Sequence, residues 1–178
     1  MKVYQLLDDH EDSSVLQALS KKGEIILNSI ETLENTLKWE TPYLTFFLEK
    51  EHDDLITYFD CTLLFLSQNA LQVLSPTLDN YLQLFPVKLY LEKEANYYAM
   101  KPSTILDCID KEKSVLETDE EGNIYPEKIT LKKSKLSNLP IFRPFVGTHN
   151  PILVSEEFKK KVVQNGLTGF HFLEVEVE

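Results

Sequence analysis

The sequence predicts a mixed α+β fold, in which two similar strand–helix–strand units are joined by a largely antiparallel β segment. The clearer unit ends the chain. There, an apolar run at residues 152–154 is followed by Ser155, whose hydroxyl can cap a helix. The helical stripe that follows consists of Phe158, Val162 and Val163. Gly166 is suited to the left-handed end of that helix, and residues 170–177 form an extended, largely apolar strand.

The same order of features occurs earlier, at residues 61–91. An apolar run leads to Ser67 in the capping position, a helical stripe follows, and residues 81–91 have the composition of a strand. Pro76 falls inside this helix, where a proline removes a backbone hydrogen bond. We interpret the two stretches as an internal duplication of one strand–helix–strand unit.

The first quarter of the chain is the hardest part to interpret. Residues 2–7 indicate an opening strand, and the run from Val15 to Leu19 suggests a short helix that stops at Gly23. The structure of residues 8–42 as a whole is left open. A strand at residues 43–48 follows.

The middle of the chain is expected to be mostly extended. Residues 96–101 predict a strand whose Tyr97 and Tyr98 face opposite sides. Residues 119–123 are typical of a turn, which favours a hairpin or a longer loop. Residues 129–131 indicate a half-exposed strand, and the two prolines of residues 140–146 favour an edge or irregular strand. His171, in the final strand, is expected to be partly buried.

The net charge of −11 is distributed unevenly along the chain. Residues 1–60 hold 13 acidic and 5 basic side chains, residues 61–127 hold 11 and 5, and residues 128–178 hold 5 and 8. An acidic body repels nucleic acid and anionic membranes, so neither is expected as a partner. The charge favours a basic protein partner, or a surface that is acidic only for solubility.

The length of 178 residues fits a single domain over residues 1–178, and a division into sub-lobes at about 1–91 and 92–178 stays open. The start lacks the apolar segment of a signal peptide, and no apolar run is long enough to span a bilayer. We therefore expect a cytoplasmic protein. Cys61 and Cys108 lie far apart among apolar residues and are expected to be reduced and buried. The sequence does not predict the oligomeric state.

No recognised catalytic or cofactor-binding pattern occurs in the sequence. The four histidines are scattered, no glycine-rich phosphate loop is present, and Arg143 is the only arginine. We therefore predict no catalytic residues, no metal site and no cofactor. The alternative is a small hydrolase or transferase that uses Ser155 or a pair of carboxylates, with Asp60, Asp107 and Asp110 as candidates.

A series of short motifs between residues 60 and 170 has a distinctive order. They are DCTLLFLS at residues 60–67, LFPV at 84–87, YY at 97–98, LDCID at 106–110 with Ser114, IFR at 141–143, LVSE at 153–156 and LTGF at 167–170. In this order they resemble the bacterial polymorphic-toxin immunity proteins of family eleven. The resemblance covers about residues 43–177.

The resemblance implies a non-catalytic protein that binds and neutralises a cognate toxin inside the producing cell. We expect it to occlude the active site of the toxin, and an acidic surface would suit a basic, nucleic-acid-directed toxin. The expected contact residues form two acidic clusters: Glu49, Glu51, Asp53 and Asp54 in the first, and Asp119, Glu120 and Glu121 in the second. An interaction module with a non-toxin partner is the remaining alternative.

Overall fold

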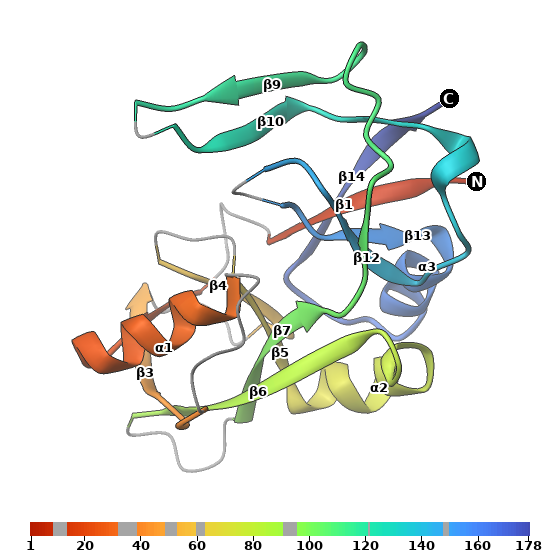
Figure 1. Cartoon of the computed structure of the whole chain (residues 1–178). Coiled ribbons are helices and arrows are strands. Elements are labelled where there is room, and N and C mark those ends of the chain that lie inside the picture. Colours follow the sequence, from red (N-terminus) through yellow and green to blue (C-terminus); the bar gives the residue numbers. More distant parts are fainter. Residues whose placement is uncertain are drawn as a thin grey trace.

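The computed structural model describes residues 1–8, 14–31, 39–48, 53–59, 63–90, 96–120, 122–147 and 150–178. In these ranges the chain has the mixed α+β fold that the sequence predicts. It comprises a six-stranded sheet, a closed six-stranded barrel and a two-stranded hairpin (Figure 1). No helix in these ranges is long and apolar enough to cross a membrane.

The six-stranded sheet has the order β11–β14–β1–β13–β12–β8. Its strands are β1 (Val3–Asp8), β8 (Ile105–Leu106), β11 (Thr130–Leu131), β12 (Ile141–Pro144), β13 (Leu153–Ser155) and β14 (Phe170–Val177), with a short 3₁₀ helix, η1 (Lys133–Lys135), after β11. β1 lies between β13 and β14 and runs antiparallel to both. The first strand of the chain is therefore held between two strands from its end.

The barrel has the order β2–β3–β6–β7–β5–β4. Its strands are β2 (Val15–Ala18), β3 (Tyr43–Leu48), β4 (Leu55–Tyr58), β5 (Leu64–Ser67), β6 (Leu82–Leu89) and β7 (Asn96–Pro102). The helix α1 (Lys21–Glu31) contributes Leu27 and Ile30 to an apolar cluster with Leu16, Phe65 and Tyr97. Tyr98 packs against a different cluster, so the prediction that the paired tyrosines face opposite sides is confirmed.

Two helices follow strands directly, as the sequence predicts: α2 (Gln68–Leu78), which contains Pro76, and α3 (Glu156–Gln164). The Ser67 hydroxyl accepts the Ala70 N–H at 3.0 Å, and the Ser155 hydroxyl accepts the Phe158 N–H at 3.2 Å. Both predicted caps are confirmed.

The two strand–helix–strand segments also share a strand arrangement. β7 lies between β5 and β6 and is antiparallel to both, as β1 is to β13 and β14. The middle strand comes from a different place in the chain in each case. That the segments are copies of one unit stays a prediction.

Among the described residues, the largest apolar cluster connects the barrel to the six-stranded sheet. α2 packs against α3, and buried side chains from both sheets surround them. Members of this cluster include Tyr4 and Val154 from the sheet, Leu66 and Met100 from the barrel, and Phe158 from α3. Truncating any of these side chains would therefore disturb the packing of both the barrel and the six-stranded sheet.

Two of the predicted strand and helix assignments are wrong. Val15–Ala18 forms β2 rather than a helix, and Gly23 lies inside α1. β2 pairs with β3 on one side and β4 on the other, and this pairing closes the barrel. Ile141–Pro144 is not an edge strand, because β12 lies between β13 and β8.

Pro144 is compatible with this interior position because of the direction of its nitrogen. The N–H groups of Arg143 and Phe145 both donate toward β8, to the carbonyls of Thr104 and Leu106 at 2.9 and 2.8 Å. The nitrogen of the residue between them points the other way, so the hydrogen bonds to β8 need no donor from Pro144.

Three predicted exposures are also wrong. Val163 is 66% exposed although the helical stripe placed it in the core, and His171 is exposed rather than partly buried. Thr130 is buried with its apolar neighbours Ile129 and Leu131 rather than exposed, because β11 pairs with β14 over a third apolar cluster. Cys108 is buried as predicted, and its burial raises the pKa of the thiol to about 11. Cys61 lies outside the described residues.

Candidate interaction surface

The hairpin of β9 (Val115–Thr118) and β10 (Ile124–Lys128) forms a two-stranded sheet of its own (Figure 1). The Asp119 carboxylate closes its turn: Oδ1 accepts the Asn123 N–H at 2.8 Å, and Oδ2 accepts the Asn123 side-chain amide at 2.9 Å. Gly122, with a φ of 86°, donates its N–H to the Asp119 carbonyl at 3.1 Å. The predicted turn is confirmed, and its hydrogen bonds join Asp119 to Gly122 and Asn123.

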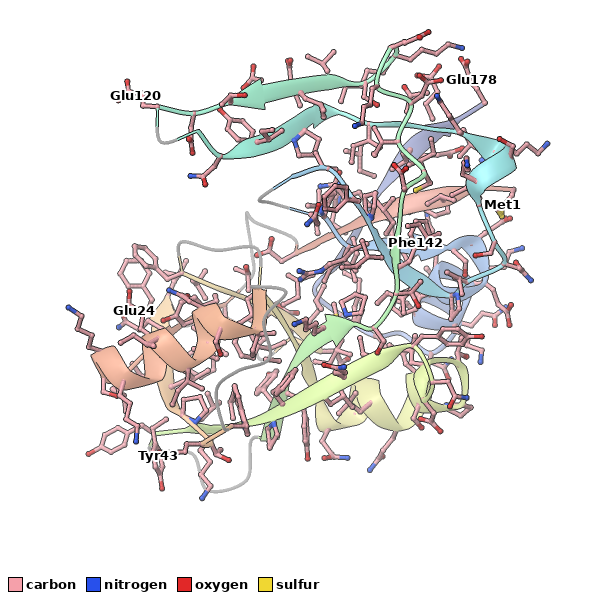
Figure 2. All side chains as sticks on the ribbon, viewed as in Figure 1. Met1, Glu24, Tyr43, Glu120, Phe142 and Glu178 are labelled. Atoms are coloured by element: carbon pink, nitrogen blue, oxygen red, sulfur yellow. The ribbon has the colours of Figure 1, made fainter. Side chains whose placement is uncertain are left out.

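Three acidic residues were expected at this tip. Asp119 is half-buried and forms the turn, whereas Glu120 is exposed at the end of the hairpin (Figure 2). Glu121 lies outside the described residues. Two further exposed acids, Glu117 and Glu127, occur on the strands. Neither was predicted as a contact residue from the sequence, although both lie within ten residues of the turn.

Charged and polar contacts attach the base of the hairpin to the six-stranded sheet. The Ser114 hydroxyl donates to the Thr130 carbonyl at 3.2 Å and accepts the Thr130 N–H at 3.0 Å. Lys128 forms an ion pair with Glu176 of β14 at 2.9 Å, and this contact lowers the pKa of the Glu176 carboxyl. The charge of Lys128 is therefore already balanced, which leaves the acids of the hairpin in excess.

The Glu117 carboxylate lies beside Tyr125, its partner across the hairpin. A hydrogen bond between the two side chains, together with burial and the nearby acidic charge, raises the pKa of the Tyr125 hydroxyl. The pair adds a cross-strand contact to one face of the hairpin.

The first predicted acidic cluster has a different environment. The half-buried Asp54 carboxylate accepts hydrogen bonds from the Ser67 hydroxyl at 2.5 Å, the Asn69 amide at 3.0 Å and the Thr168 N–H at 3.2 Å. It therefore links the start of α2 to the loop after α3. Asp53 is half-buried beside it, and Glu49 and Glu51 lie outside the described residues.

The LTGF motif meets this cluster from the other side. Gly169 has a φ of 78°, and a Cβ atom at this position would lie 2.3 Å from the Leu55 carbonyl oxygen and 2.7 Å from the Asp53 Cβ. The Leu55 N–H donates to the Thr168 carbonyl at 3.2 Å. The turn at Thr168–Gly169 thus attaches the end of the chain to the barrel, which is a structural role for these residues.

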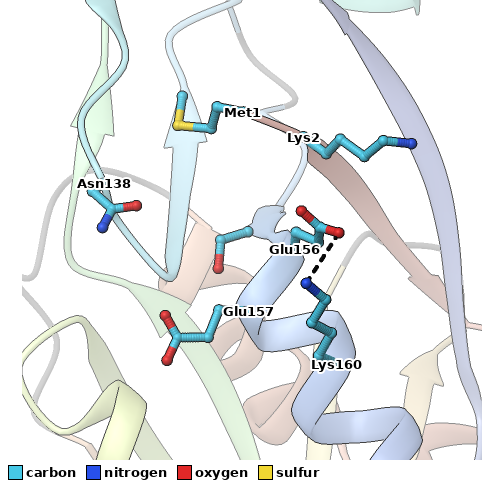
Figure 3. Close-up of a pocket in the computed structure, with 7 residues that line it drawn as sticks. Met1, Lys2, Asn138, Glu156, Glu157 and Lys160 are labelled. Carbon is cyan, nitrogen blue, oxygen red and sulfur yellow. Dashed lines mark ion pairs between the residues drawn. The ribbon is translucent and has the colours of Figure 1, made fainter.

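A shallow pocket of about 370 Å³ lies at the start of α3 (Figure 3). It is lined by Met1, Lys2, Asn138, Ser155, Glu156, Glu157 and Lys160. Lys160 is paired with Glu156 at 3.2 Å, and Lys2 with Glu174 at 3.0 Å. The contact with Glu174 raises the pKa of Lys2, so this amine is charged at neutral pH and is a poor base for activating Ser155.

The alternative of a hydrolase or transferase gains little from this pocket. Asp107 and Asp110 do not line it, and Asp60 lies outside the described residues. Asp110 instead accepts the Glu112 N–H at 3.1 Å. In the described ranges, no group of three or more His, Cys, Asp or Glu side chains could hold a metal ion.

A family model for immunity proteins, Imm11, matches residues 21–177. The chain belongs to the Imm11 immunity protein family. The match confirms the resemblance seen in the motifs and extends it to α1. A search of curated proteins finds no match. Membership of Imm11 indicates a role in toxin immunity, with a cognate toxin as the partner, and immunity proteins of this kind are generally non-catalytic.

Proposed function

We propose that this Imm11 protein binds a cognate toxin in the cytoplasm of the producing cell and neutralises it by covering the active site of the toxin, without catalysing a reaction itself. The observation that carries the proposal is the family match over residues 21–177. Lys2 and Lys160, the two lysines that line the Ser155 pocket, are both in ion pairs. Neither is a neutral amine that could act as a base on the Ser155 hydroxyl, which supports a non-catalytic role.

The second acidic cluster is the better candidate for contact with the toxin. Glu120 is exposed at the tip of the hairpin, and the hydrogen bonds of Asp119 fix the turn that carries it. A fixed turn loses little conformational freedom when it binds. The Asp54 carboxylate, in contrast, already accepts hydrogen bonds from three groups of its own chain. We assign it to stability first and to binding only second.

The partner that fits this surface is a basic toxin, such as one that acts on nucleic acid. The active site of such a toxin must be positively charged to attract phosphates. A carboxylate-rich hairpin complements that positive charge. Opposite net charges also accelerate association, because they steer the two proteins together before contact.

The proposal is tested by co-expressing the chain with the toxin domain encoded beside its gene. We expect cells that carry both to grow and cells that carry the toxin domain alone to arrest. Growth arrest in both cultures, with the chain present as folded protein, would overturn the proposed function.

The role of the hairpin acids is tested by the double variant Glu120→Lys, Glu127→Lys. We expect association with the toxin domain to slow about tenfold at low salt and the difference to shrink near 0.5 M salt, since screening shortens the reach of charge. Stopped-flow binding at several salt concentrations measures both effects.

The matched control is Glu24→Lys, Asp79→Lys, which makes the same charge change at two exposed acids away from the hairpin. A purely global effect of net charge would slow the two double variants equally. Equal slowing would remove the hairpin from the proposed interface while leaving the immunity function in place.

A further proposal concerns the scaffold that holds this surface. The two strand–helix–strand segments, at β5–α2–β6 and β13–α3–β14, are similar units with the same serine cap and the same kind of intervening strand. We propose that they are copies of one unit, joined by the mainly antiparallel strands between them. Structures of other Imm11 proteins would test this, since both segments should superpose throughout the family.

A further inference from the structure

The outer strand of the hairpin has an open hydrogen-bonding edge. The Asp119 N–H donates to the Asn123 carbonyl at 3.0 Å, which makes these two residues a hydrogen-bonded pair. Such pairs alternate with non-hydrogen-bonded pairs along an antiparallel ladder. The register pairs Glu117 with Tyr125 and places Thr118 opposite Ile124. Glu117 therefore bonds to β10, and the N–H and C=O groups of Thr118 point away from it.

The same alternation applies to Leu116, two residues earlier. It lies opposite Pro126, a residue that has no N–H to donate, which agrees with a non-hydrogen-bonded position. The N–H and C=O groups of Leu116 and Thr118 thus face outward from β9 at the spacing of a further antiparallel strand. Within the described part of the chain, no backbone group beyond the hairpin bonds to them.

The opposite edge of the hairpin is not equivalent. On β10, Pro126 interrupts the row of outward donors, and the register shifts between Pro126 and Lys128. Ile124 lies against the main body, because a Cβ atom at Gly147 would be 2.7 Å from the Ile124 Cβ. Figure 1 accordingly shows β10 nearer to the six-stranded sheet and β9 on the outside. Prolines and irregular pairing are common means of closing an edge, and β9 has neither of them.

We infer that the outer edge of β9 is a docking site for an extended strand of the toxin, which adds a third strand to the hairpin. This inference rests on the proposed function and adds to it the geometry of binding. Main-chain hydrogen bonds would supply affinity, and the side chains beside the edge would select the sequence. A two-stranded hairpin is marginally stable alone, so a third strand would also stabilise it.

Charge determines which strand fits. Glu117 lies on β9 between the two outward-facing residues, and Asp119 and Glu120 follow at its end. A strand with lysine or arginine at alternating positions complements these carboxylates. A second copy of this chain does not, because antiparallel pairing of two β9 strands would bring the same acids together, in proteins that each carry a net charge of −11.

The decisive variant is Thr118→Pro, with Thr118→Val as its matched control. Proline removes the outward N–H but leaves the bonds of Glu117 to β10, whereas valine keeps the N–H and removes only the hydroxyl. The probe is the toxin domain encoded beside the gene of this chain, with its active site inactivated. We expect Thr118→Pro to weaken binding about tenfold and Thr118→Val to change it less than about twofold, as measured by titration calorimetry.

Amide hydrogen exchange on the unmodified chain gives an independent readout. The N–H groups of Leu116 and Thr118 should exchange rapidly in the free protein and at least tenfold more slowly when the toxin domain is bound. Binding without this protection, or with equal affinity for the proline variant, would overturn strand docking and leave the immunity function intact. Absence of any binding would overturn both.

A dimer of the chain alone that Thr118→Pro dissociates would overturn the assignment in another way, because a second copy would then occupy the edge. Sedimentation of the free protein distinguishes this outcome. We expect a monomer that sediments identically in the proline and valine variants.

Discussion

At the scale of single residues, the contact between Gly169 and the barrel is the tightest of those made by the glycines in the described ranges. Its φ is left-handed, and a Cβ atom added here would lie only 2.3 Å from the Leu55 carbonyl oxygen, so this position has room for a hydrogen atom only. Gly122 has a similar φ but open space around it. The two glycines therefore separate the cost of backbone strain from the cost of a steric clash.

We predict that Gly169→Ala lowers the free energy of unfolding by at least about 3 kcal/mol, and that Gly122→Ala lowers it by about 1 kcal/mol. Both variants place alanine in a left-handed conformation, but only the first must also move the Leu55 carbonyl and the Asp53 side chain. Urea denaturation of the two variants measures the difference. Equal losses would show that the loop after α3 can move away from the barrel at little cost in free energy.

The role of Asp54 could not be predicted from the sequence because its partners are distant along the chain. Ser67 is 13 residues away and Thr168 is 114 residues away. The acidic run at residues 49–54 therefore indicates only a charged surface. The serine caps, by comparison, involve groups three residues apart, and local spacing was sufficient to predict both.

At the scale of elements, the two capped helices differ in one contact. The Ser155 hydroxyl accepts one backbone N–H, whereas the Ser67 hydroxyl accepts one and also donates to the Asp54 carboxylate at 2.5 Å. Hydrogen bonds to charged groups contribute more to stability than neutral ones.

We predict that Ser155→Ala costs about 1 kcal/mol of unfolding free energy and that Ser67→Ala costs about 2 to 3 kcal/mol. Thermal or urea unfolding of both variants provides the comparison. The excess in Ser67→Ala should vanish in the Asp54→Ala background, as a double-mutant cycle would show. If the extra loss of stability persisted in that background, it would come from the cap rather than from the bond to Asp54.

The elements that the sequence predicts well are those with local patterns: the capped helices and the turn at residues 119–123. β2 and β12 are different, since each is four residues long and depends on its neighbours. β2 is a strand because it pairs with β3 on one side and β4 on the other. β12 is internal because the two-residue β8 pairs with the edge that would otherwise be open. Such pairings join distant parts of the chain and leave no periodicity in the sequence.

At the scale of the whole molecule, the cluster around α2 and α3 joins the barrel to the six-stranded sheet. Phe158 is fully buried in it, and its ring packs against Phe170 and Phe172 with centroids 6.3 and 6.4 Å apart. Trp39, the only tryptophan, packs on Phe85 in the barrel, with ring centroids 4.9 Å apart. Its fluorescence therefore reports on the barrel alone.

We predict that the chain unfolds in one cooperative transition, as a single domain over residues 1–178 would. Phe158→Ala should lower the free energy of unfolding by about 3 to 5 kcal/mol and should shift the fluorescence of Trp39 and the circular dichroism together. Separate midpoints for the two signals would instead favour sub-lobes near residues 1–91 and 92–178.

The place of β1 has a consequence for how the protein is made. Lys2 and Glu174, which form an ion pair across β1 and β14, are 172 residues apart. A ribosome synthesises β1 long before β13 and β14, the two strands beside it. β1 must therefore wait, exposing Tyr4 and Leu6, until translation reaches the end of β14. The centre of the six-stranded sheet therefore forms only after β14 has been synthesised.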